Sequence, residues 1–158
     1  MKHFILTICI GIFLISCTSN NSADNVTLIE KYIQSVESQD YETMEAMLDE
    51  NYLGLGPSYG DSIRKPAALE NWKDNIENLY DTIKYNRSRS AAFTISDGEH
   101  QGEWVSNWAE LNITYQEGIG EITIWANTVY QIENDKIIRS LTFYNEADAL
   151  YQLGFRIY

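Results

Sequence analysis

Four polar residues with hydrogen-bonding side chains stand where a strand pattern would otherwise place apolar residues. They are Asn107, Thr128, Arg139 and Asn145. Each follows the inward alternation of its own segment, as Asn107 does between Val105 and Ala109, so all four are expected on the buried face of a sheet. An unpartnered buried polar group costs about 1–3 kcal/mol. Each of these residues is therefore satisfied in the core, placed at a frayed strand end, or exposed to a cavity.

A polar-lined cavity would bring these residues together as a binding site. Tyr32 belongs to the apolar stripe of a helix-like segment and could meet them across such a cavity. The stretch 50–62 contains glycines and Pro57, which favour a turn at a pocket rim. We therefore predict a pocket with seven wall residues, namely Tyr32, Tyr52, Trp72, Asn107, Thr128, Arg139 and Asn145.

The N-terminus has the pattern of an export signal. Lys2 precedes an apolar run over residues 4–16, which is shorter than the roughly 20 residues that a membrane-spanning helix needs. The segment 14–17 resembles the bacterial lipobox, which implies that Cys17 is lipidated after residues 1–16 are removed; the alternative is an ordinary signal with a chance cysteine. Residues 17–24 are then expected to form a flexible tether, and Thr18 favours anchoring in the outer membrane of the cell envelope, on its periplasmic or surface side.

Nucleophilic and metal chemistry have few candidate residues after such processing. Cys9 is lost, Cys17 is consumed by the lipid, and His100 is the only histidine left. A Ser-His-Asp triad needs a histidine base, and a zinc site needs several His or Cys ligands. The acidic turn over residues 97–103 could bind a divalent cation such as calcium, but a solvated hairpin is the simpler interpretation. We predict no metal site and no cofactor.

The charge balance excludes one class of partner. The chain carries 11 basic and 23 acidic residues, and loss of residues 1–16 removes one basic and no acidic residue, which leaves a net charge of −13. Nucleic-acid binding requires a basic patch that displaces counterions from phosphates. We therefore expect no nucleic-acid partner. We also expect the acyl chains, rather than the acidic protein surface, to attach the protein to the lipid bilayer.

Residues 25–158 are expected to form one domain of the α+β class. Apolar residues recur at helical spacing in 26–38, after Asp40, which can cap a second helix, and after Pro66, where the apolar face extends to Tyr80. Beyond Asp81 the chain alternates like strands over four ranges, namely 83–95, 104–115, 121–132 and 136–145. The expected inward sets include Tyr130 in the third range and Leu141 and Phe143 in the fourth. Three N-terminal helices packed on a curved antiparallel sheet are the predicted architecture.

This order of elements resembles the nuclear transport factor 2-like superfamily. The local marks are the segments 28–33 and 39–42, the turn 134–138, and the tail 151–154, which is similar to the end of the SnoaL-like branch. The resemblance implies a cone with an internal pocket between helix 1 and the sheet. It also implies a dimer through the outer sheet face, where Trp104 and Trp108 are expected.

The acids of the superfamily's enzymes are missing at the matching positions. Tyr32 matches the oxyanion-donating tyrosine of ketosteroid isomerase, but Gly56 stands where its general base should precede the proline, and Thr128 stands near its second donor. Asn145 stands at the position of the acid/base aspartate of SnoaL-like cyclases, and an amide cannot act as a general base. Glu146 is adjacent but has the opposite parity.

Three functions follow as alternatives. The first is a lipid-anchored domain that binds a small, largely apolar molecule or a protein partner without catalysis. The second is a SnoaL-like lyase, isomerase or cyclase, in which Tyr32, Asn107 and Asn145 polarise a carbonyl and an unrecognised carboxylate takes the proton. The third is an adaptor that assembles protein partners.

Overall fold

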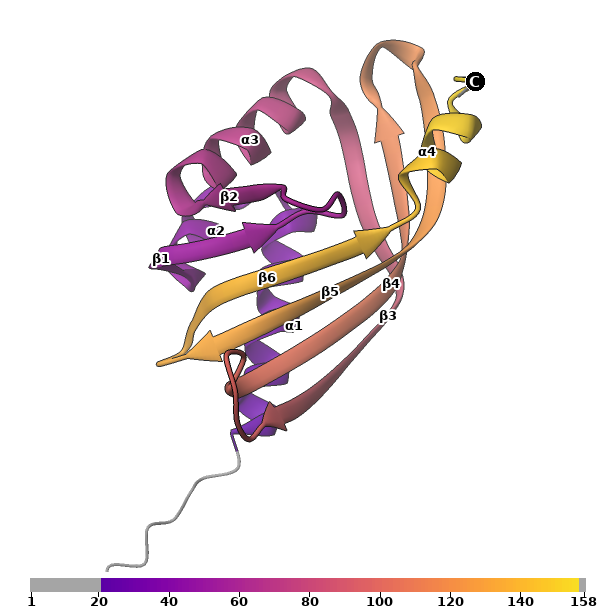
Figure 1. The fold of residues 1–158 in the computed structure, drawn as a ribbon. Helices are drawn as coiled ribbons and strands as arrows, with labels where there is room; N and C mark the ends of the chain where they lie inside the picture. Colours follow the sequence, from indigo (N-terminus) through magenta and orange to yellow (C-terminus); the bar gives the residue numbers. More distant parts are fainter. Residues whose placement is uncertain (1–20, 157–158) are drawn as a thin grey trace, which may run out of the picture.

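The computed structural model describes residues 21–156. They form a mixed α+β fold in which four α-helices accompany one curved, open, six-stranded sheet of order β2-β1-β6-β5-β4-β3 (Figure 1). The predicted α+β class is confirmed. The expected signal peptide, Cys17 and the first residues of the tether lie outside the described residues. No helix within the described range is long and apolar enough to cross a membrane.

The helices begin where short polar side chains or proline favour a helix start. In α1 (Ser22–Glu37), the apolar stripe of Ile29, Ile33 and Val36 is buried. The predicted cap of α2 (Tyr41–Met47) is confirmed, because the Asp40 carboxylate accepts the Thr43 amide at 3.0 Å. The third helix, α3 (Lys65–Asn78), has its proline in the first turn.

The four long strands form antiparallel pairs in sequence order. They are β3 (Tyr80–Ile95), β4 (Gly102–Tyr115), β5 (Gly120–Glu133) and β6 (Lys136–Tyr144), with the short 3₁₀ helix η1 (Gln116–Gly118) between β4 and β5. Asn134 and Asp135 both have positive φ values of 51° and 58°. Two such residues between strands are typical of a tight hairpin turn.

The stretch expected as a turn at the pocket rim contains a strand pair. β1 (Leu48–Leu55) pairs antiparallel with β2 (Ser62–Arg64) and parallel with β6, so the expectation of a wholly antiparallel sheet is wrong. The physical reason is the length of the connection: α3 and the β3–β5 meander lie between β1 and β6, which leaves room for a parallel crossover.

A bulge reverses the side-chain parity of β6. Ile132 opposes Ile137, but Gln131 opposes Arg139, so β6 has one extra residue between the two pairs. Beyond the bulge Ser140 and Thr142 face the helices. Leu141 and Phe143, which were predicted to face inward, face outward instead. A one-residue shift moves every later side chain to the opposite face.

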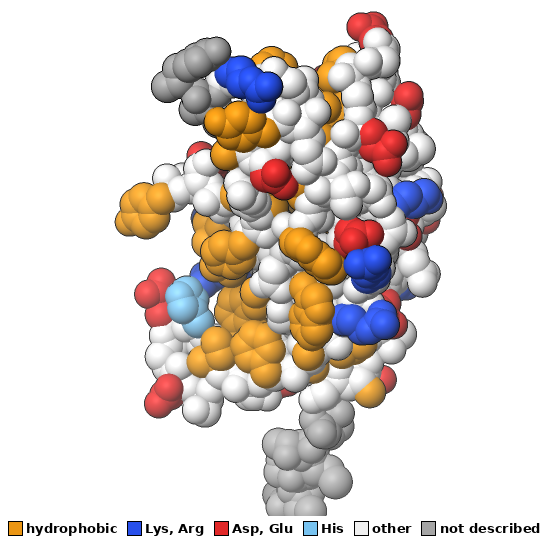
Figure 2. All heavy atoms as spheres, turned by 90° about the vertical axis from the view of Figure 1, so that its right-hand side faces the viewer, with side chains coloured by type: hydrophobic (Ala, Val, Ile, Leu, Met, Phe, Trp, Pro, Cys, Tyr) orange, Lys and Arg blue, Asp and Glu red, His pale blue; other side chains and the backbone are white. Residues whose placement is uncertain are grey.

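The outer face of the sheet carries large exposed aromatic side chains. Phe93, Trp108, Trp125 and Phe143 are 40–59% exposed, and cross-strand pairs place them on one face (Figure 2). Trp104 was also expected to be exposed there, but it is only 3% exposed. The β3–β4 turn covers it, because the indole N–H donates to the His100 carbonyl at 2.8 Å and the ring stacks on Phe93.

The fourth helix, α4 (Glu146–Gln152), is an element that the sequence patterns did not predict. Asn145 caps it, because the Asn145 side-chain oxygen accepts a hydrogen bond from the Asp148 backbone N–H at 3.1 Å. The Gln152 side-chain oxygen then accepts a hydrogen bond from the Thr123 backbone N–H at 2.8 Å, which attaches the helix to the edge of β5. α4 therefore closes one end of the space between the helices and the sheet.

Candidate functional site

A cavity of about 450 Å³ lies between the inner face of the sheet and the helices. Tyr32 from α1, Trp72 from α3 and Leu150 from α4 contribute to its wall, and every strand of the sheet adds residues. A cavity of this size matches the lower part of the range for small-molecule sites. It is therefore the candidate functional site.

Aromatic side chains dominate the cavity wall. Trp72 and seven tyrosines of the described chain line it: Tyr32, Tyr52, Tyr80, Tyr85, Tyr115, Tyr130 and Tyr144. The rings of Tyr32 and Tyr130 meet edge to face, with centroids 6.0 Å apart. The cavity is thus apolar over most of its surface but contains phenol groups that can form directed hydrogen bonds.

Burial keeps these phenols neutral at physiological pH. It raises the pKa of Tyr32 and of Tyr130 well above the ordinary value, while hydrogen bonds from Trp72 and Thr128 oppose the rise. Burial also raises the pKa of Tyr80 to about 12. A neutral phenol retains its proton, so these groups can donate a hydrogen bond to a ligand carbonyl or hydroxyl.

A row of hydroxyl groups crosses one wall of the cavity. The Tyr52 and Ser140 hydroxyl oxygens are 2.7 Å apart, and those of Thr128 and Thr142 are 3.2 Å apart. All four residues line the cavity, and they come from β1, β5 and β6. These groups form the polar part of an otherwise aromatic site.

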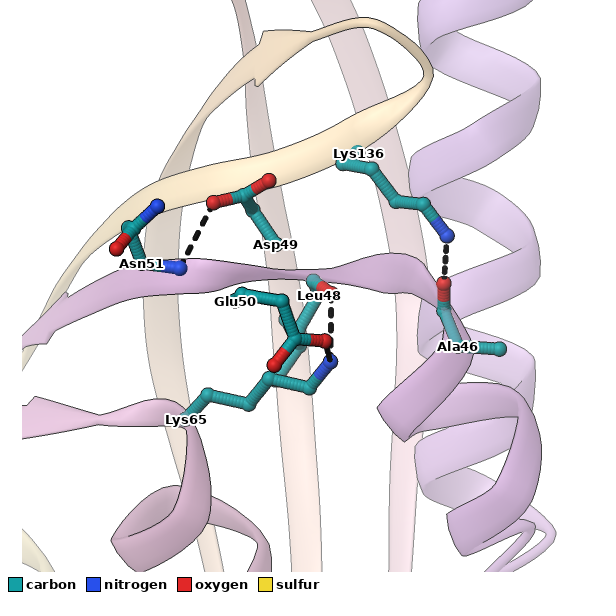
Figure 3. A network of polar contacts seen from close by, with 7 residues as sticks. All are labelled: Ala46, Leu48, Asp49, Glu50, Asn51, Lys65 and Lys136. Atoms are coloured by element: carbon teal, nitrogen blue, oxygen red, sulfur yellow. Dashed lines mark hydrogen bonds and ion pairs between the residues drawn. The ribbon is translucent and has the colours of Figure 1, made fainter.

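Two lysines hold β1 in the position that brings Tyr52 to this wall. The Lys65 ammonium donates to the Leu48 carbonyl at 3.1 Å and pairs with Glu50 at 2.7 Å, and Lys136 donates to the Ala46 carbonyl (Figure 3). Both carbonyls lie at the α2–β1 junction, where a helix end leaves acceptors without intrahelical partners. The lysines satisfy these acceptors and fix the start of β1.

Charged groups are scarce in the wall. Glu146, in the first turn of α4, is the only carboxylate among the described residues that line the cavity, and no described Lys or Arg lines it. A second cavity of about 410 Å³ shares part of the wall, including Tyr52, Asn71 and Thr142, and adds Asp61. Both carboxylates belong to exposed residues. General acid–base catalysis inside the aromatic chamber therefore has no buried carboxylate of the described chain available to it.

The structure brings together four of the seven predicted wall residues. Tyr32, Tyr52, Trp72 and Thr128 all line the cavity. Asn107 lies outside it, although it is buried at 2% exposure as its parity indicated. Its side-chain amide instead donates to the Ser88 hydroxyl at 2.8 Å and to the Ser90 hydroxyl at 3.1 Å, so it is a satisfied core residue.

Arg139 and Asn145 are also placed away from the cavity. The β6 bulge turns Arg139 outward, where its guanidinium lies 2.8 Å from His100 Nδ1. The strand ends before Asn145, so that residue becomes the α4 cap instead of a wall residue. Both expectations of an inward position are corrected by these local features.

Most of the tyrosines that form the wall were missed as site residues. Tyr80 was assigned to the apolar face of the third predicted helix, but it begins β3. Tyr85 and Tyr115 come from strand segments whose aromatic residues were interpreted only as strand formers. Tyr130 was assigned to the inward parity of its strand, so a signal existed for that residue alone. Ser140 and Thr142 had no signal, because their inward position depends on the bulge.

Among residues 21–156, no group of three or more His, Cys, Asp or Glu side chains is arranged to hold a metal ion.

Comparison with known proteins defines the fold. No family model matches the sequence, and no curated protein matches it. A protein from Xanthomonas campestris pv. campestris, described as a polyketide cyclase, superimposes with a TM-score of 0.69 at 14% identity, over 84% of this chain and 98% of that chain. An NTF2-like protein from Burkholderia xenovorans gives 0.66 at 13% identity, over 84% and 97%.

The chain has the nuclear transport factor 2-like fold. A further member of the same fold, a protein from Shewanella denitrificans described as a SnoaL-like polyketide cyclase, gives a TM-score of 0.65 at 12% identity, over 81% of this chain and 95% of that chain. At these identities the likeness shows the nuclear transport factor 2-like fold alone, and one fold can serve many functions. The function must be argued from the cavity.

Proposed function

We propose that the cavity binds a small, largely apolar molecule that carries a hydroxyl or carbonyl group. The observation that supports this is the hydroxyl row of Tyr52, Ser140, Thr128 and Thr142 on a wall otherwise made of aromatic and aliphatic side chains. Apolar pockets with a few placed polar groups are typical of small-molecule sites. The aromatic surface supplies affinity, and the hydroxyl row orients the polar group of the ligand.

A SnoaL-like lyase, isomerase or cyclase is the second candidate. The fold neighbours described as polyketide cyclases favour this alternative over binding without catalysis. In this version the neutral Tyr32 phenol polarises a ligand carbonyl, and Glu146 is the carboxylate that takes the proton. Asn107 and Asn145 have no part in it, since neither lines the cavity.

We further propose that the domain is exported and lipid-anchored through Cys17. The support is the sequence pattern alone. α1 begins at Ser22, so the last three residues of the expected tether, 22–24, are helical and the tether is shorter than predicted. The test is metabolic labelling of the full chain with a fatty acid in a bacterial host. Label on the parent and none on Cys17→Ser is expected, whereas equal labelling of both would contradict the anchor.

Homodimerisation through the outer sheet face is the remaining proposal on partners. The exposed aromatic residues Trp108, Trp125 and Phe143 support it, because grouped exposed aromatic residues commonly belong to interfaces. The same face would serve the adaptor alternative, in which a different protein covers it.

The binding proposal is tested first with two probes that differ by one hydroxyl, 2-naphthol and naphthalene. We expect 2-naphthol to bind more tightly, and Thr142→Val to remove that preference because it deletes one hydroxyl without changing the side-chain shape. Thr94→Val, on an exposed part of β3 outside the cavity, is the matched control. Tyr32→Phe should weaken the binding of 2-naphthol as well.

Native mass spectrometry of the folded domain gives an independent readout. A small molecule retained by the folded protein and released on denaturation supports the pocket. If 2-naphthol does not bind and no molecule is retained, the binding proposal is wrong. Turnover of a retained carbonyl compound that is lost in Glu146→Gln would establish the enzymatic alternative.

A further inference from the structure

The mouth of the cavity is acidic on two sides. Glu146 lines the main cavity from α4, and Asp61 lines the adjoining cavity from the β1–β2 connection. The two cavities share Tyr52, Asn71 and Thr142 as common wall residues, so the carboxylates belong to neighbouring parts of one hollow. A ligand that extends from the main cavity past this shared wall therefore approaches both acids.

Tyr144 is an aromatic wall residue in the same region as these two carboxylates. It lines the main cavity at the end of β6, immediately before α4. Burial raises its pKa, and the negative charges of Glu146 and Asp61 raise it further. The Tyr144 ring is therefore a neutral aromatic surface in a region of negative charge.

No described Lys or Arg forms an ion pair with either of these acids. Within residues 21–156 the ion pairs are Lys65–Glu50 and Arg87–Glu110, neither of which includes the two acids at the mouth. No described Lys or Arg lines either cavity. An anionic ligand would meet repulsion at the mouth and would find no cation inside, so this ligand class is disfavoured.

The aromatic interior favours a cationic ligand. The negative faces of aromatic rings attract organic ammonium groups, with about 0.5–1 kcal/mol per contact at exposed sites and about 2 kcal/mol or more at desolvated ones. Tyr32, Tyr85 and Tyr130 surround the interior, and their neutral phenols keep the rings free of charge. A cation with an apolar body gains from both the rings and the mouth.

We propose that the preferred ligand is a small organic cation, with its ammonium group at the mouth between Glu146 and Asp61 and its apolar part among the tyrosines. This inference rests on the proposed binding function and names its ligand class. It assigns Glu146 and Asp61 as residues that select positive charge. It also gives a role to Asp61, an exposed residue of the β1–β2 connection.

The test uses three probes of nearly the same shape that differ in charge: benzyltrimethylammonium, neopentylbenzene and phenylmethanesulfonate. Each is titrated calorimetrically against the folded protein, alongside 2-naphthol as the reference for the cavity itself. We expect the cation to bind roughly tenfold more tightly than its neutral isostere, which corresponds to about 1.4 kcal/mol. The anion should bind most weakly, and added salt should reduce the preference for the cation.

The variant Asp61→Asn/Glu146→Gln should abolish the preference for the cation over neopentylbenzene. The matched control is Asp97→Asn/Glu99→Gln, which removes two acids from the β3–β4 turn, at the end of the sheet away from α4 (Figure 1). If 2-naphthol binds and the cation has no advantage over neopentylbenzene, the charge inference is overturned and the pocket stands. If the cation and 2-naphthol both fail to bind, the proposed binding function fails together with the charge inference. Equal losses in the variant and the control also overturn the inference.

Discussion

The hydroxyl groups of Tyr52 and Ser140 lie 2.7 Å apart and join β1 to β6 across 88 positions of sequence. Both residues are buried, and both line the main cavity and the adjoining one. The pair therefore serves the sheet and the site together: it ties the parallel strand pair on its inner face and supplies two hydroxyls of the polar row.

Removing either hydroxyl of this pair alone should lower the free energy of unfolding by more than half of what removing both lowers it. Tyr52→Phe or Ser140→Ala leaves the other hydroxyl buried without its partner, so each should lower the free energy of unfolding by about 1–3 kcal/mol. The double variant should cost less than the sum, because it leaves no orphaned group. Urea unfolding of the four proteins measures this coupling. Strictly additive losses would show that the hydroxyls do not interact.

Asn107→Leu should destabilise the fold without weakening ligand binding. The Asn107 amide donates to Ser88, which lies within a β3 irregularity between Asn86 and Arg89, and to Ser90 just beyond it. Its loss leaves both hydroxyls without this donor. We expect a loss of about 1–3 kcal/mol in unfolding free energy and unchanged affinity for 2-naphthol. Asn78→Ala, at an exposed helix end, is the control. A selective loss of binding would return Asn107 to the site.

Lys65 and Glu50 should contribute unequally although they form one ion pair. The Lys65 side chain is 9% exposed and that of Glu50 is 87% exposed. Lys65→Met leaves the Leu48 carbonyl without its donor and should cost about 1–3 kcal/mol. Glu50→Gln breaks only a surface pair and should cost less than about 1 kcal/mol. Equal losses in chemical denaturation would mean that the ion pair, rather than the carbonyl contact, holds β1.

Alkaline pH should unfold the protein through its buried tyrosines. An unfolded tyrosine loses its proton near pH 10, whereas burial holds Tyr80 protonated to about pH 12. Between these values the unfolded state binds fewer protons, so the free energy of unfolding is intact below pH 10 and falls as pH rises toward 12. Tyr80→Phe should make the fall less steep, as followed by circular dichroism. An equally steep fall in Tyr80→Phe and in the parent would contradict a role of Tyr80 in alkaline unfolding.

Trp125→Glu should convert a dimer to a monomer. Trp125 is 59% exposed on the outer sheet face, and a carboxylate there would be buried without a partner at an interface. Sedimentation velocity should show a dimer for the parent and a monomer for the variant, with unchanged circular dichroism. Ile119→Glu, an exposed position in the loop after η1, should remain dimeric. A monomeric parent would assign the aromatic face to another partner or to none.

Sequence patterns located the helices and long strands because their signals are local. Asp40 was recognised as a cap from its position before an apolar stripe, and the same contact appears in the structure. Tyr32 and Tyr130 were assigned to inward faces because helical spacing and strand alternation each repeat along one segment. Such signals need no knowledge of which segments pair.

The errors arose where pairing between distant segments decides the outcome. The parallel contact of β1 with β6 and the α4 cap at Asn145 were not anticipated. Trp104 alternates like an exposed residue, and it is buried only because a turn folds over it. Neither the burial of Trp104 nor the partner of β1 is determined by the local alternation of residues.

The sequence by itself determined the α+β class, the excess of negative charge and the inward positions of Tyr32 and Thr128, since composition and periodicity are properties of single segments. Only the tertiary structure decided that Ser140 and Thr142, rather than Arg139 and Asn145, face the cavity. The strand end and the α4 cap removed Asn145 from the wall. One extra residue in β6 turned Arg139 outward and Ser140 and Thr142 inward, because a bulge reverses the side-chain parity of all later residues of the strand and depends on the register of its partner.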